Sequence, residues 1–148
     1  MGKYGQQKYG TFLYGGLWAR PVHDRTEAGV RNRAPKAYCN AADLQRLEDN
    51  CAVLAELLGV SVETRSWQRT DWPTVSEFSR IRSNIQALRD AYYTLSTTPP
   101  TPENPLNHWV KWNDAERILL DLYTLYHRNL EATNYTGEVF AGESIGVI

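Results

Sequence analysis

The sequence has 148 residues, the length of one ordinary domain or of a smaller domain with long extensions. Its formal net charge of −1 gives no global attraction to nucleic acid or to an anionic membrane. Without a signal peptide or an apolar run that could span a bilayer, the expected product is soluble and made inside the cell. Five Trp and nine Tyr are more than a small core needs, and surplus aromatic residues are typical of interfaces.

Residues 1–36 lack the periodicity of a folded domain. A Tyr-Gly pair recurs every five residues, which matches neither a helix nor a strand, and glycine is unfavourable inside both. We therefore predict an extended arm whose rings need another surface, either the bundle or a neighbouring subunit. The alternative is a disordered terminus, although disordered segments are normally poor in aromatic residues. The predicted partner-binding residues of this arm are Tyr4, Tyr9, Phe12, Tyr14 and Trp18.

The arm continues into a basic segment from Arg20 to Lys36, which contains Pro21 and Pro35. We interpret this segment as a solvated linker with room for one short helical turn. Its five cations could contact a phosphate backbone, but neither interleaved aromatic residues nor a recognised nucleic-acid-binding fold accompanies them.

Three helices are predicted next, so the expected fold class is all-α, a three-helix bundle. The first helix spans about residues 41–58, with Asn40 as its N-cap and Gly59 after its end. Cys51 lies on its apolar stripe and is expected to be a small buried residue. Cys39 is roughly 18 Å away along such a helix, too far for a disulfide.

The second helix is predicted over about residues 75–95, because Thr74 and Glu77 match a capping box and apolar residues then alternate in steps of three and four. In the connection before it, Trp67 and Trp72 are expected to cover an end of the bundle. The connection after it, residues 96–112, contains four prolines. We interpret it as a stiff spacer that carries the chain back along the bundle, with recognition by an adaptor domain as the alternative.

The third helix is predicted over about residues 114–131, with Asn113 and Glu116 as its capping box. It is apolar on nearly every side except one seam, so we expect it to be the centre of the bundle. After Leu130 the pattern stops, and residues 133–148 are interpreted as a C-terminal tail that binds a surface through Tyr135 and Phe140. The predicted parts are thus 1–36, arm and linker; 37–132, bundle; and 133–148, tail.

No catalytic or metal-binding pattern is found. His23, His108 and His127 each lack a second ligand at helical spacing. Glu138 and Glu143 could be read as paired carboxylates, but their Gly-rich surroundings supply no rigid frame. Nucleophile elbows, Walker loops and dinucleotide fingerprints are missing from the sequence. We therefore expect no enzyme, no cofactor and no metal site.

The order of several short motifs resembles a known group of proteins. These motifs are the Tyr-Gly repeats, AYCNAADL at residues 37–44, DWPT at 71–74, NDAERIL at 113–119, GE at 137–138 and AGE at 141–143. Together they resemble small helical virion proteins, or modules, encoded among the tail genes of phages and prophages of Gram-positive bacteria. The likeness covers most of residues 37–143.

This resemblance implies a structural role at a phage tail tip, a baseplate or a related contractile particle. The implied partners are other virion structural proteins and copies of the chain itself, in a symmetric assembly that is made in the host bacterial cytoplasm and ends in the virion tail. Two other classes remain open from the sequence. One is a nucleic-acid-binding helical module, and the other is a free adaptor or regulatory protein.

Overall fold

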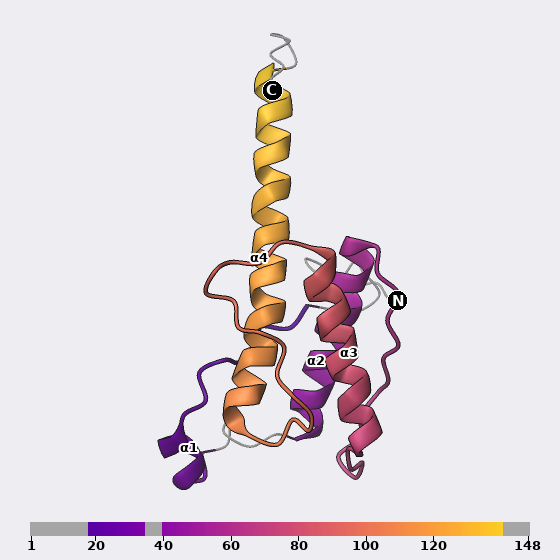
Figure 1. Ribbon diagram of the computed structural model, residues 1–148, viewed down its shortest axis with the longest axis vertical. Helices are drawn as coiled ribbons and strands as arrows, with labels where there is room; N and C mark the ends of the chain where they lie inside the picture. Colours follow the sequence, from indigo (N-terminus) through magenta and orange to yellow (C-terminus); the bar gives the residue numbers. More distant parts are fainter. Residues whose placement is uncertain (1–17, 35–39, 141–148) are drawn as a thin grey trace.

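The computed structural model describes residues 18–34 and 40–140, with side chains described as far as Ala132. These residues form four helices and no strand: α1 (Glu27–Arg31), α2 (Ala41–Leu58), α3 (Val75–Ala91) and α4 (Trp109–Phe140). Helices α2, α3 and α4 pack on one another as a bundle (Figure 1). The predicted all-α class is therefore confirmed.

The three bundle helices all run in the same direction (Figure 1). Residues near their N-terminal ends pair with one another: Arg46 of α2 with Glu116 of α4, and Arg80 of α3 with Glu48 of α2. Parallel neighbours require each connection to return along the length of the bundle. Residues 59–74 and 92–108 make these two returns.

The first return is held by side chains of α2 and α3. Asn84 Nδ2 donates to the carbonyl oxygen of Glu63 at 2.7 Å, and Trp67 Nε1 donates to the carboxylate of Glu48 at 2.8 Å. Trp67 is therefore buried against α2, whereas Trp72 is 86 % exposed. The prediction that both indoles cover the bundle is wrong for Trp72.

The second return is the proline-rich segment. Carbonyl oxygens of this segment accept hydrogen bonds from α3, Pro99 from Arg89 Nε at 3.2 Å and Pro102 from Arg82 Nε at 2.8 Å. These carbonyl oxygens are available because the prolines keep the segment out of a helix, in which backbone N–H groups would use them. The predicted spacer along the bundle is confirmed.

Helix boundaries differ from the prediction at three places. Helix α3 ends at Ala91 rather than near residue 95, and α4 spans Trp109–Phe140 rather than 114–131. Asn113 is therefore not an N-cap, and the predicted capping box with Glu116 is wrong. The first eight residues of the predicted tail, 133–140, belong to α4, which projects beyond the ends of α2 and α3 (Figure 1).

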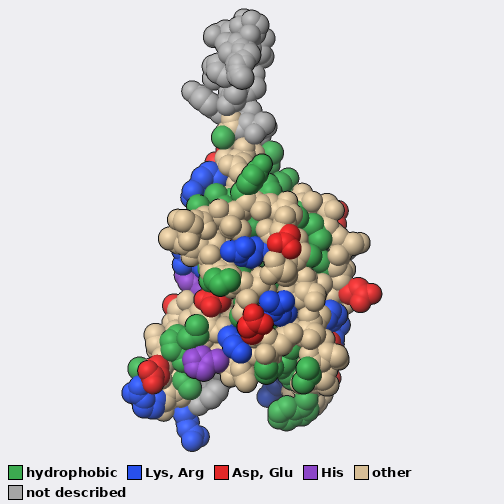
Figure 2. Space-filling view, in the orientation of Figure 1, with side chains coloured by type: hydrophobic (Ala, Val, Ile, Leu, Met, Phe, Trp, Pro, Cys, Tyr) green, Lys and Arg blue, Asp and Glu red, His purple; other side chains and the backbone are tan. Residues whose placement is uncertain are grey.

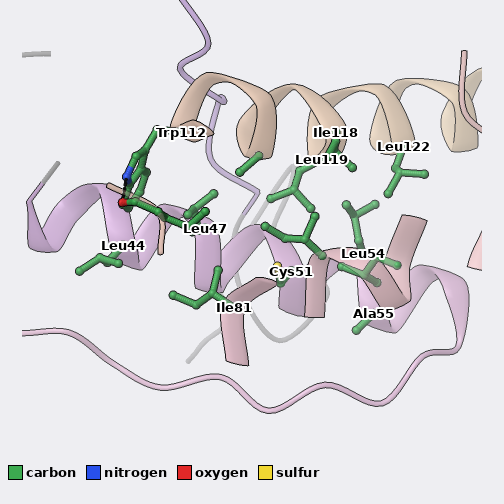
Figure 3. Close-up of a cluster of buried hydrophobic side chains, with 14 of the residues drawn as sticks. Leu44, Leu47, Cys51, Leu54, Ala55, Ile81, Trp112, Ile118, Leu119 and Leu122 are labelled. Atoms are coloured by element: carbon green, nitrogen blue, oxygen red, sulfur yellow. Dashed lines mark hydrogen bonds between the residues drawn. The ribbon is translucent and has the colours of Figure 1, made fainter. Parts of the chain in front are cut away.

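The core lies between the three bundle helices, and Figure 3 shows side chains from all of them meeting there. Cys51 is 1 % exposed and is a free cysteine, as expected. Burial and the nearby charge of Glu48 raise the pKa of its thiol. The fully buried leucines and isoleucines are Leu47, Leu54, Ile81, Ile85, Leu88, Ile118, Leu119 and Leu122.

Candidate functional site

The described chain begins with a segment that lies on the bundle, residues 18–25, which we call the strap. The indole of Trp18 stacks on Tyr123 with ring centroids 3.8 Å apart and planes 5° from parallel. Ala19 and the Asn50 side chain exchange two hydrogen bonds, each of 2.8 Å. The strap thus begins on α2 and α4, held by both stacking and hydrogen bonds.

The strap then runs along α4 in the direction opposite to the helix. The backbone N–H of Val22 donates to Glu116 Oε1 at 3.0 Å. The backbone of Arg25 exchanges two hydrogen bonds with the side chain of Asn113, of 3.1 and 2.9 Å. Because these contacts move from Tyr123 toward Asn113 as the strap advances, its course on the bundle is fixed.

A buried cluster of charged side chains holds the C-terminal end of the strap on the bundle. Arg25 Nη2 lies 3.0 Å from Glu116 Oε2 and 3.3 Å from Asp43 Oδ1, and the side chains of Arg25 and Glu116 are fully buried. Arg46 pairs with the same two carboxylates. Burial alone lowers the pKa of Arg46, but hydrogen bonds and charge attraction to Glu116 and Asp43 raise it above its ordinary value. The solvated-linker interpretation is therefore wrong for Arg25.

A second network of ion pairs stabilises the turn that precedes the N-terminal end of α3. Arg80 Nη2 pairs with Glu48 at 2.6 Å and with Glu77 at 3.0 Å. Arg65 pairs with Glu77 at 2.7 Å and with Asp71 at 2.9 Å. Together these pairs hold the end of the first return against α3, immediately before Trp72.

An open cleft of about 740 Å³ lies at the end of the bundle where α2, α3 and α4 begin. We call it the aromatic cleft. Figure 2 shows hydrophobic side chains gathered at this lower end, at the foot of α3. Its charged lining residues are Glu27, Arg69 and Asp71. Its main apolar lining residues are Leu44, Trp72, Phe78, Leu106, Trp109 and Trp112.

The start of α4 builds one wall of this cleft. Trp112 is 2 % exposed, and its Nε1 donates to the carbonyl oxygen of Leu106 at 2.8 Å. Lys111 Nζ donates to the carbonyl oxygen of Pro105 at 3.1 Å. These bonds fold the end of the second return onto the first turn of α4 and leave Trp109 half-buried beside the opening.

The predicted partner-binding residues fall into three groups. Trp18 is half-buried against Tyr123 of α4, so this ring lies on the bundle, one of the two surfaces expected for it, and its binding to a partner stays a prediction. The backbones of Tyr135 and Phe140 belong to α4, and their side chains lie outside the described residues. The remaining predictions also lie outside the described residues: Tyr4, Tyr9, Phe12 and Tyr14.

Sequence reasoning missed the charge cluster and the aromatic cleft. The only local signal for the cluster is an arginine between Pro21 and α1, which resembles any exposed cation. For the cleft, the signal was the set of three indoles at 72, 109 and 112.

Comparison with known proteins gives no match to this chain, whether with a family model, a curated protein or a solved structure. Among the side chains described for residues 18–34 and 40–132, no group of three or more His, Cys, Asp or Glu is placed to hold a metal ion. Over residues 18–34 and 40–140, no helix combines the length and apolarity needed to cross a membrane.

The second charge network leads to a pH prediction. Hydrogen bonds from Arg65 and Arg80 hold the pKa of Glu77 below its ordinary value. A lowered folded-state pKa gives stability that is present above the unfolded-state pKa and is lost as the pH falls through the folded-state value. We expect Glu77→Gln to lower the free energy of unfolding by about 1 kcal/mol or less at pH 7, since the pairs are partly exposed.

The difference between wild type and Glu77→Gln should shrink below about pH 4, where an unperturbed glutamate becomes protonated. Urea unfolding at a series of pH values measures it. Glu56→Gln, an exposed position of α2, is the matched control. A difference that stays constant from pH 7 to pH 3 would contradict the assignment.

Proposed function

We propose that this protein is a structural subunit of a phage tail, baseplate or related contractile particle, in which it joins neighbouring subunits through its terminal arms. The observation that carries the proposal is the fixed course of the strap. Buried charges and backbone hydrogen bonds hold residues 18–25 on the bundle. The Tyr-Gly arm that precedes Trp18 is thus attached to a rigid body at a defined place, as an assembly connector needs to be.

The distribution of surfaces along the bundle supports the same proposal. The strap begins at Tyr123, and α4 projects past the bundle on that side (Figure 1). The aromatic cleft lies at the opposite end. A subunit with extensions at one end and an open apolar surface at the other is suited to repeated contacts between copies.

The nucleic-acid-binding alternative loses support from the same contacts. Arg25 is enclosed by carboxylates, and Arg31 lies 3.8 Å from Glu27 in the neighbouring turn. These two cations of the basic segment therefore face carboxylates of the chain itself. Among the described residues, no observation favours a free adaptor protein over a subunit of an assembly.

Deleting residues 1–17 tests the proposed function. Because the strap and the core remain, we expect the helix content by circular dichroism to be nearly unchanged. Incorporation into particles of the phage or prophage that carries the gene should be lost. Mass spectrometry of purified particles measures incorporation, with the Glu56→Gln chain as a control that should enter normally.

Two outcomes would overturn this proposal. One is the absence of the wild-type chain from purified particles. The other is normal incorporation of the chain that lacks residues 1–17, which would leave the arm without its proposed role.

A further inference from the structure

We propose that the aromatic cleft of one copy receives the Tyr-Gly arm, residues 1–17, of a second copy, so that identical subunits join head to tail. This inference rests on the proposed function, because it names the partner of the connecting arm. It is carried by three observations: the exposed apolar surface of the cleft, the composition of the arm, and the place on the bundle at which the strap begins.

The cleft presents apolar surface that its own described chain leaves uncovered. Trp72 is 86 % exposed, and Trp109 is half-buried beside the opening. Burying apolar area is favourable, and large exposed apolar patches commonly mark interaction sites. The volume of about 740 Å³ lies within the range of roughly 300–1,000 Å³ that is usual for binding sites.

The composition of the arm matches this surface. The arm repeats a Tyr-Gly pair three times and contains no Asp or Glu. Phenol rings pack favourably against indoles, and the glycine after each tyrosine lets the backbone approach closely. The two arm lysines, Lys3 and Lys8, also suit a lining that contributes two carboxylates, Glu27 and Asp71, and one guanidinium. The volume suits one Tyr-Gly repeat with its neighbours rather than the whole arm.

The course of the strap favours the arm of a second copy over the chain's own arm as the occupant of the cleft. The strap runs toward the cleft from Tyr123, which lies about 16 Å along the α4 axis from Trp112. Trp18, to which the arm is joined, therefore lies at the end of the strap that is farther from its own cleft. Reaching that cleft would require a reversal and a second pass along the bundle, whereas the cleft of a subunit stacked ahead requires neither.

Such a contact joins two different surfaces, an arm and a cleft, and is therefore heterologous. Repetition of a heterologous contact gives a closed ring if the rotation between subunits closes, and an open filament if it does not. Each copy has one arm and one cleft, so blocking either surface should stop the growth of the assembly.

Two complementary variants test the contact. The first lacks residues 1–17 and keeps the cleft. The second carries Trp72→Ser and keeps the arm; Trp72 is exposed enough for this change to leave the fold intact. Tyr93→Ser is the matched control, because Tyr93 is 72 % exposed and does not line the cleft.

Sedimentation velocity at a series of concentrations is the measurement. We expect the wild type and Tyr93→Ser to form oligomers larger than dimers, and each of the two complementary variants alone to remain monomeric, with association weakened at least tenfold. An equal mixture of the two should form dimers and stop there, since it offers one intact cleft and one intact arm per pair.

Several results would overturn the head-to-tail contact. These are a wild type that stays monomeric, a chain without residues 1–17 that still associates, or a mixture that forms no dimer. A monomeric wild type whose tryptophan fluorescence changes when residues 1–17 are removed, with no such change in the Trp72→Ser background, would assign the cleft to the chain's own arm. If Tyr38→Ser alone changed that fluorescence while the wild type stayed monomeric, the occupant would be the segment between α1 and α2.

The failure of this contact is distinguishable from the failure of the proposed function. A monomeric wild type that still enters particles through residues 1–17 would remove the head-to-tail contact alone. Oligomers in solution, together with absence of the chain from particles, would remove the virion role alone.

Discussion

Replacing Glu116 by alanine is expected to lower the free energy of unfolding by about 3–5 kcal/mol. Glu116 is fully buried and accepts hydrogen bonds from Arg25, Arg46 and the backbone of Val22. Its removal would leave the buried guanidinium of Arg25 with only Asp43 as a carboxylate partner, shared with Arg46. An uncompensated buried charge is costly because it has lost its hydration.

Urea unfolding monitored by circular dichroism measures this loss. Glu27→Ala is the control, since Glu27 and Arg31 form an exposed pair whose side chains are 78 % and 67 % accessible. Pairs of this kind contribute about 0–1 kcal/mol. Equal effects of the Glu116 and Glu27 substitutions would show that the strap is not held by its charges.

Leu119→Ala is expected to lower the free energy of unfolding by about 2–5 kcal/mol, because it leaves a cavity at the centre of the bundle. Leu119 is 0 % exposed and belongs to the cluster that all three bundle helices share. Leu130→Ala lies on the same helix at 44 % exposure and should change stability by less than about 1 kcal/mol.

Thermal and urea unfolding of the two leucine variants provide the comparison. If Leu130→Ala destabilised the isolated protein as much as Leu119→Ala, the projecting part of α4 would be as tightly packed as its base. The placement of the core would then be wrong.

The sequence was sufficient to predict the end of a helix where the residues that cap it are its immediate neighbours in the chain. Asn40 accepts a hydrogen bond from the backbone of Asp43, whose side chain accepts one from the backbone of Asn40. Gly59 ends α2 with φ 71°, a left-handed conformation that favours glycine. Both ends of α2 were therefore predicted from a few neighbouring residues.

The start of α4 could not be predicted in this way. Asn113 and Glu116 have the spacing of a capping box, but both side chains bind the strap, about ninety residues away in sequence. A residue pattern does not reveal whether a polar side chain will bind its own helix or a distant segment. The burial of Arg25 could not be predicted for the same reason. The carboxylates that compensate its buried charge, Asp43 and Glu116, belong to α2 and α4.

The aromatic cleft was hidden because it depends on topology. Its rings come from the end of the first return, from α3 and from the start of α4, which meet only because α3 and α4 begin at the same end of the bundle. Connection length was the available signal. Sixteen or more residues join successive bundle helices, enough to span the roughly 27 Å of α2 in an extended conformation.

Parallel helices also affect how the chain reaches its native state. Adjacent helices in an up-and-down bundle can meet as a hairpin soon after a short turn forms. In this protein no two successive bundle helices form such a hairpin, because each pair must first close a loop of at least sixteen residues. The mean sequence separation of its native contacts is thereby increased, which slows folding relative to a hairpin-linked bundle of equal size. Hydrophobic collapse early in folding therefore gains little stability from local pairing of helices. Helices α2, α3 and α4 become stable together, when all three have packed on one another.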